Sequence, residues 1–158
     1  MIYFTTFIFT LLLSHIVRAV PACGNVASPQ QVYDTKQPLL YQVTWDDVYD
    51  NPNGDTDSVS CSDGQNGLAG EYPQFQNFPD FPYLGGAFDI TWGSSNCGTC
   101  WKLTVTQTGR FIYFTAIDAT AAGFNIGKTA FIALNGGTVG SGTLDAEAIS
   151  VAGHFCGF

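Results

Sequence analysis

Five cysteines constrain this chain more than any other feature, and two of them, Cys97 and Cys100, stand within residues 96–101. A Cys-x-x-Cys pair indicates a redox or zinc site in a reducing compartment. In a secreted protein the same pair indicates two half-cystines with separate partners. The interpretation of the pair therefore depends on the compartment in which the chain folds.

The amino terminus predicts export. Residues 2–13 form an almost unbroken apolar run, which is shorter than the roughly 20 residues needed to cross a bilayer. Small residues suited to cleavage follow it. A buried amino-terminal helix is the alternative, but the run is interrupted only by Thr5, Thr6 and Thr10, which do not give such a helix a polar outer face. We therefore expect residues 1–19 to be a signal peptide and the mature chain to be secreted and extracellular.

An oxidising compartment makes disulfides the expected state of four cysteines, namely Cys61, Cys97, Cys100 and Cys156. These allow three pairings. A bond between Cys97 and Cys100 would close too short a loop to stabilise the fold much, so distant partners are favoured. A zinc site of Cys97, Cys100, His154 and Cys156 is disfavoured, because its His-x-Cys end lacks the usual finger spacing. We expect no metal and no cofactor.

Charge narrows the class of partner. The 139 residues after the signal peptide suffice for one domain with a hydrophobic core. They carry four Lys and Arg against thirteen Asp and Glu, a formal net charge of −9. That charge disfavours nucleic acid and anionic membranes, and it suits a neutral or weakly basic polymer.

The mature chain is expected to begin with an irregular extension over residues 20–40, followed by one domain over residues 41–158. The extension has little periodicity and contains Cys23, the odd cysteine. Cys23 could be a free thiol, be removed by processing, or join two chains in a dimer.

Alternating and apolar runs predict a mainly β domain. We expect strands at residues 41–45, 58–61, 101–105, 111–118 and 144–152, with a hairpin turning at Gly109. Residues 129–134 fit a helix slightly better than a strand, because Asn-Gly-Gly follows them. Many short strands with glycine turns imply a compact barrel or sandwich.

Two loops have alternative interpretations. The acidic loop 46–55 could suggest calcium, but its Asp spacing does not match an EF-hand loop, so a solvated hairpin loop is favoured. Residues 72–83 place five aromatics on a segment whose prolines forbid a helix. Such a segment is either a lid over the core or a stacking surface, and the lid is favoured because large aromatics usually bury.

Several segments, in order, resemble the cerato-platanin family of small secreted fungal proteins. They are Val43-Thr44-Trp45-Asp46, Cys61-Ser62-Asp63-Gly64, Asn66-Gly67-Leu68, the Phe-Pro stretch ending at Gly85-Gly86, Cys97-Gly98-Thr99-Cys100-Trp101, Ala116-Ile117-Asp118, Gly123-Phe124-Asn125-Ile126, and Leu144-Asp145-Ala146 with Cys156-Gly157.

The resemblance implies a single-domain double-ψ β barrel with short helices, similar to the first domain of expansins. It also implies disulfides Cys61–Cys97 and Cys100–Cys156. Family members resemble non-hydrolytic cell-wall proteins that bind chitin-type oligosaccharides, loosen cellulose or act as elicitors perceived at the plant surface. Asp118 matches the aspartate associated with loosening.

The candidate site residues follow from this function. Asp118 and Asn125 would hydrogen-bond sugar hydroxyls, while Trp92, Tyr113 or Phe124 would stack on sugar rings, although a place in the core is likewise expected of such aromatics. Asp118 and Asp89 could form a hydrolase pair, but the acid–base constellation is weak, so we expect no enzyme. The alternative is a surface-active or signalling protein without a sugar groove.

Overall fold

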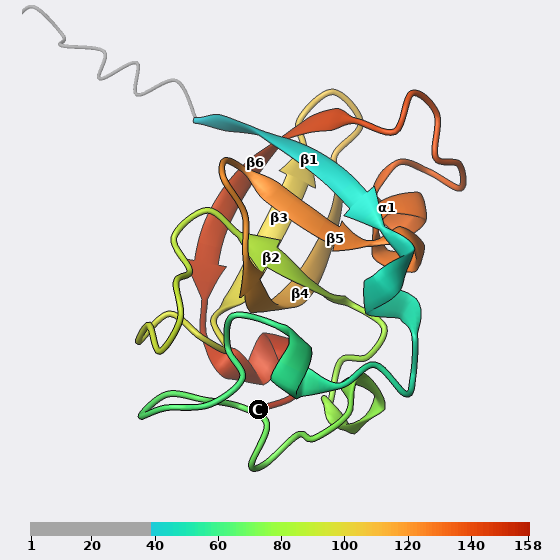
Figure 1. The fold of residues 1–158 in the computed structure, drawn as a ribbon. Coiled ribbons are helices and arrows are strands. Elements are labelled where there is room, and N and C mark those ends of the chain that lie inside the picture. Colours follow the sequence, from blue (N-terminus) through green and yellow to red (C-terminus); the bar gives the residue numbers. More distant parts are fainter. Residues whose placement is uncertain (1–38) are drawn as a thin grey trace, which may run out of the picture. The chain divides into compact units, whose positions relative to one another are not determined.

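The computed structural model describes residues 39–158, and Figure 1 shows the barrel that they form. The expected signal peptide, Cys23 and nearly all of the expected extension lie outside the described residues. The strands are β1 (Leu40–Asp46), β2 (Leu84–Ala87), β3 (Cys100–Val105), β4 (Arg110–Ala119), β5 (Phe124–Gly127) and β6 (Leu144–Val151), and the helix is α1 (Lys128–Leu134). Short 3₁₀ turns cover Asp47–Asp50, Thr56–Ser58, Phe75–Asn77 and Gly153–Cys156.

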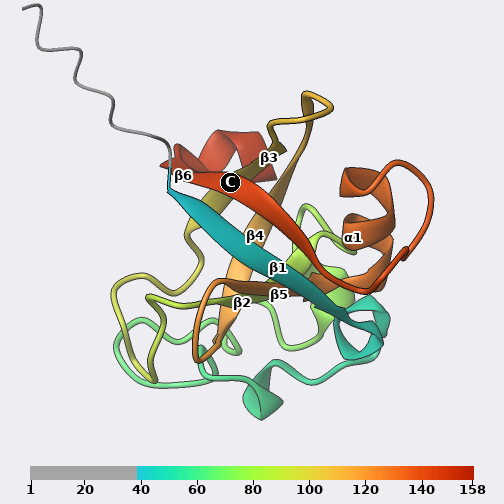
Figure 2. The same ribbon diagram turned by 90° about the horizontal axis from the view of Figure 1, so that it is seen from above.

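The six strands close in the order β1-β5-β2-β4-β3-β6. Two pairs are parallel, β1 with β5 and β2 with β4, and the other four are antiparallel. In the view from above, β1 and β6 run beside each other where the barrel closes (Figure 2). This closed mixed barrel with two disulfides confirms the predicted fold class.

The predicted hairpin is present as β3 and β4, joined by a turn in which Gly109 adopts a positive φ of 70°. The predicted helix is also present, as α1, and it buries Ala130, Phe131 and Leu134. Within residues 39–158, no helix has the length and hydropathy to cross a membrane.

Two local predictions are wrong. Residues 58–61 are not a strand, because the Asp55 carboxylate caps a 3₁₀ turn and the Cys61 N–H then bonds to the Ile117 carbonyl across a loop. The loop 46–55 does not close a hairpin, since β1 pairs with β5 and β6 and not with the segment that follows it. Local turn residues in both segments bond to distant strands.

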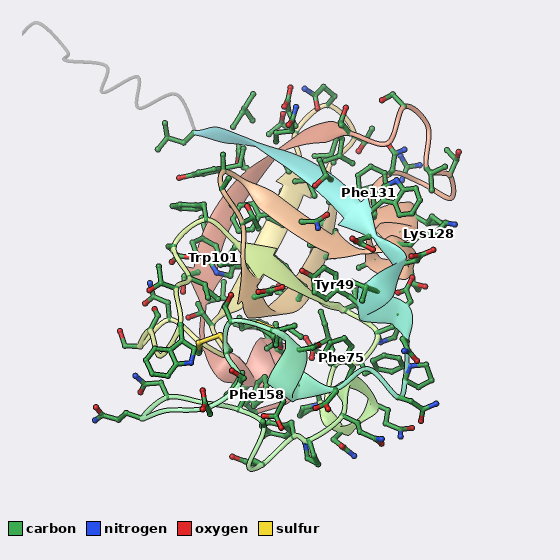
Figure 3. All side chains as sticks on the ribbon, in the orientation of Figure 1. Tyr49, Phe75, Trp101, Lys128, Phe131 and Phe158 are labelled. Atoms are coloured by element: carbon green, nitrogen blue, oxygen red, sulfur yellow. A yellow bond between two sulfur atoms is a disulfide. The ribbon has the colours of Figure 1, made fainter. Side chains whose placement is uncertain are left out.

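The core has two parts. Inside the barrel the buried side chains include Val43, Leu103, Phe114, Phe124 and Ile126. A second cluster lies against the barrel and consists of Tyr49, Phe75, Phe78, Leu84 and Ile117. Phe75 and Phe78 are at most 3% exposed, and Figure 3 shows Phe75 next to Tyr49. The lid interpretation of residues 72–83 is therefore confirmed for these two aromatics.

Candidate functional site

One row of residues crosses four adjacent strands on the outside of the barrel. By strand register Thr44 lies opposite Asn125, Asn125 opposite Gly86, and Gly86 opposite Asp118. Residues directly opposite each other share one face of a sheet. Adjacent strands are about 4.8 Å apart, so Asn125 and Asp118 lie about 10 Å apart. We call Thr44, Asn125, Gly86 and Asp118 the polar row.

A register shift in β2 and β4 shapes the row. Gly85 lies opposite Ala116 and Gly86 opposite Asp118, so Ile117 is the extra residue of a bulge. Bulges re-aim side chains and occur next to functional sites. Gly86 carries no side chain, and a Cβ there would meet the methyl group of Thr120 at 2.8 Å. The centre of the row is therefore backbone covered by Thr120.

Asp118 is surrounded by hydrogen-bond donors. Its Oδ1 accepts from the Ser60 N–H (2.9 Å), the Ser60 hydroxyl (2.7 Å) and the Ala119 N–H (2.8 Å). Its Oδ2 accepts from the Tyr49 hydroxyl (3.1 Å). Burial, and then the nearby Asp118 carboxylate, raise the pKa of Tyr49, which keeps that hydroxyl a donor. These four hydrogen bonds fix the orientation of the Asp118 carboxylate.

Asn125 has a free donor. Its Oδ1 accepts from the Thr44 hydroxyl at 2.9 Å, whereas Nδ2 donates to no described residue and is not buried. Asn125 therefore has an N–H group available to a ligand, two strands away from the acceptor Asp118.

Phe124 points the other way. It is 1% exposed and packs against the rings of Trp101 and Phe114 inside the barrel. Successive residues of a strand face opposite sides, so an outward Asn125 requires an inward Phe124. The prediction that Phe124 stacks on a sugar is therefore wrong. Tyr113 is half-buried and stacks on Phe155 with ring centroids 4.9 Å apart.

Asp89 and Trp92 belong to a separate loop. The Asn96 amide donates to the Asp89 carbonyl (3.0 Å) and to its Oδ2 (3.1 Å), so Asp89 fixes its own loop. Asp89 shares no hydrogen bond with Asp118 or with the donors around Asp118. Trp92 is 66% exposed, and its Nε1 donates to Asp63 Oδ1 at 2.7 Å.

The cysteines form the two expected long-range bonds. Cys61 is bonded to Cys97 and Cys100 to Cys156, with Cα atoms 5.5 and 5.8 Å apart. Disulfide sulfurs offer no thiolates, which removes the zinc alternative. Among residues 39–158, no three His, Cys, Asp or Glu side chains are grouped so as to hold a metal ion.

The cerato-platanin family model matches residues 41–158, which is nearly all of the described chain. The chain belongs to the cerato-platanin family. This membership confirms the resemblance found in the sequence.

Several known proteins are similar to this chain in sequence or in fold. Allergen Asp f 15 of Aspergillus fumigatus is 41% identical over 113 residues, which cover 71% of this chain and 73% of the allergen. The crystal structure of cerato-platanin 1 from M. perniciosa has a TM-score of 0.70 at 38% identity, covering 73% of this chain and 98% of that one. The solution structure of the fungal elicitor cerato-platanin has a TM-score of 0.68 at 36% identity, covering 73% and 95%.

In this cerato-platanin domain, several partners of the predicted site residues could not be found from the sequence. Ser60 and Tyr49 bond to Asp118 from positions 58 and 69 residues away. Thr44 bonds to Asn125 across 81 residues. No motif marked these residues as partners, because only the closed barrel brings them to the polar row.

Proposed function

We propose that this cerato-platanin protein is secreted to the cell wall, where it binds chitin-type oligosaccharides or cellulose without hydrolysing them and loosens the noncovalent packing between polymers. The polar row carries this proposal. Asn125 Nδ2 offers a donor and the Asp118 carboxylate an acceptor, about 10 Å apart on one sheet face. Sugar hydroxyls use both kinds of group, and the two ends of the row would contact neighbouring parts of an extended polymer.

The surroundings of the carboxylates support binding without hydrolysis. Glycoside hydrolysis ordinarily needs two carboxyl groups flanking the bond, one of them able to donate a proton. Asp118 already accepts four hydrogen bonds, and Asp89 is occupied by the Asn96 amide in another loop. Within residues 39–158 no hydrogen bond links the two carboxyl groups into an acid–base pair.

The proposal extends to perception by plants. A protein similar to this chain is described as a fungal elicitor. A receptor at the plant surface is the corresponding partner, and it would recognise the folded domain rather than a product of catalysis.

The binding proposal predicts that both ends of the polar row matter. Asn125→Ala should weaken binding to an N-acetylglucosamine hexamer about fivefold and Asp118→Asn about tenfold, since one hydrogen bond to a ligand contributes about 1 kcal/mol, and more when it is charged. Titration calorimetry measures the affinity. Asp145→Asn, an exposed carboxylate of β6, is the matched control and should bind like the wild type. Equal affinity in all four proteins would remove the polar row from the site.

A second assay separates the functions. Filter paper or chitin is incubated with the protein, and fragmentation and released reducing ends are measured. Fragmentation without reducing ends is expected. Reducing ends would instead indicate a hydrolase.

The same assay also tests one alternative function, that of a surface-active or signalling protein without a sugar site. The outer face of β4 and β6, with the last 3₁₀ turn, favours it, because it exposes about half of each of Phe111, Ile149 and Phe155. Neither fragmentation nor reducing ends, together with no hexamer binding, would support this alternative.

A further inference from the structure

Trp92 is an exposed aromatic that is held in place. It leaves 66% of its surface exposed, yet its Nε1 donates to Asp63 at 2.7 Å. The next residue, Gly93, accepts a hydrogen bond from Asn66 Nδ2 at 2.9 Å. The Cys61–Cys97 disulfide ties the same two loops together. Fixing an exposed ring before binding reduces the entropy that a ligand contact would otherwise lose.

An open hollow lies beside this ring. Its volume is about 450 Å³, and it is lined by Asp57, Ser62, Asp63, Gly64, Gly67, Ala69 and Gly70. Trp92 stands at the rim, because it bonds to Asp63 and because a Cβ on Gly64 would lie 3.7 Å from its ring. The volume falls in the range of small-ligand sites, about 300 to 1,000 Å³.

The hollow lacks positive charge. Asp57 and Asp63 both line it, and no Lys or Arg does. Asp63 Oδ1 is taken by Trp92 and the Ser62 hydroxyl, while neither Asp63 Oδ2 nor the Asp57 carboxylate accepts a hydrogen bond within residues 39–158. A ligand that fits here brings hydrogen-bond donors, a positive charge and a flat apolar face for the indole.

We propose that the hollow and Trp92 bind glucosamine units of a β-1,4-linked cationic amino-sugar polymer. The C–H face of the pyranose ring stacks on the indole, and the ammonium group sits beside Asp57 and Asp63. This site uses none of the residues of the polar row. It takes a charged sugar, whereas the polar row is proposed for neutral ones.

The test compares two ligands on matched variants. Affinity for a glucosamine hexamer and for the fully N-acetylated hexamer is measured by titration calorimetry at pH 5.5, at low salt and in 0.5 M NaCl. Trp92→Ala and Asp63→Asn should each weaken glucosamine binding by about tenfold, because the first removes the ring on which the sugar stacks and the second removes a charge-assisted contact. Salt should weaken it too, because exposed charges are screened.

The controls keep this inference separate from the proposed function. Phe111→Ala removes an aromatic that is 51% exposed elsewhere, and Asp145→Asn removes an exposed carboxylate. Both should bind glucosamine like the wild type. Loss of N-acetylated hexamer binding in Asn125→Ala alone would concern the polar row and not this site.

Three results would overturn the inference. They are no glucosamine binding by the wild type, unchanged binding by Trp92→Ala, and equal Trp92-dependent binding of an oligolysine peptide, which would show that charge alone is recognised.

Discussion

Asp80 is a carboxylate that folding removes from water. Its Oδ2 accepts a hydrogen bond from the buried Thr115 hydroxyl at 2.7 Å, while Oδ1 is buried without a partner among the described residues. Burial raises the pKa of Asp80 to about 6, and the bond from Thr115 only partly opposes this. The folded state therefore carries a buried charge at neutral pH.

The sign of the pH dependence follows. Below the ordinary pKa of 3.8 the carboxyl is protonated in both states, and as the pH rises through about 6 the folded state loses stability. Asp80→Asn should therefore raise the free energy of unfolding at pH 8 by no more than about 3 kcal/mol and change it little at pH 4. Urea unfolding at both pH values measures this. An equal effect at pH 4 and pH 8 would contradict the role of charge.

At this scale the sequence predicted which residues are chemically able to act, but not their surroundings. Asp118 and Asn125 do reach one row, whereas Phe124 beside them is in the core. Successive side chains of a strand face opposite sides of the sheet, so Phe124 and Asn125 must point in opposite directions. Only the pairing of β5 with β1 and β2 determines which of the two points into the barrel.

Among the elements, the parallel pair β1 and β5 depends on a close approach at Gly123. This glycine has a φ of 61°, and a Cβ there would collide with the Gln42 carbonyl oxygen of β1. Gly109, in the β3–β4 turn, has a φ of 70° but open space around it. An alanine at Gly109 would add backbone strain only, whereas an alanine at Gly123 would add both backbone strain and a steric clash.

Gly123→Ala should therefore destabilise the protein by more than about 3 kcal/mol, because β1 or the turn has to move. Gly109→Ala should cost about 1 kcal/mol, the ordinary penalty for a left-handed alanine. Thermal unfolding of both variants gives the comparison. Similar losses would mean that the contact with Gln42 relaxes freely.

Elements were predictable where their partner is close in sequence. The β3–β4 hairpin needs only two alternating runs and a glycine turn, and both its strands and its turn were correct. Residues 58–61 also read as β-forming, but Cys61 bonds to Ile117 from a loop. In this segment the tertiary contact with Ile117 outweighs the intrinsic β propensity of the residues.

At the scale of the whole molecule, the two disulfides should stabilise the fold by similar amounts but differ in how they affect glucosamine binding. Their sequence separations are 36 and 56 residues, so each restricts the unfolded chain by about 4 kcal/mol. Replacing either pair by serines should lower the unfolding free energy by about that amount. Replacing Cys61 and Cys97 should in addition weaken glucosamine binding, because their bond joins the loops of Trp92 and Asp63.

Replacing Cys100 and Cys156 is the control, since this bond joins β3 to the last 3₁₀ turn. Glucosamine titrations on both variants, at a temperature where each is folded, measure the difference. Unchanged affinity in both would show that the Trp92 loop does not depend on its disulfide.

Periodicity alone predicted a barrel or a sandwich, and the resemblance to cerato-platanins selected the barrel. The reason is that closure depends on β1 pairing on one side with β5 and on the other with β6. Neither contact leaves a local signal, because parallel and long-range pairings have no turn between them.

The pairing of the first strand with the last also governs when the protein can fold. Leu40 lies opposite Glu147, and Val43 opposite Leu144. Strand β1 therefore cannot pair with β6 until nearly all of the domain has been synthesised. Contacts between residues this far apart in sequence form slowly. Because a chain that lacks β6 cannot close the barrel, we expect it to remain unfolded during synthesis, which is the state needed for the export predicted from the amino terminus.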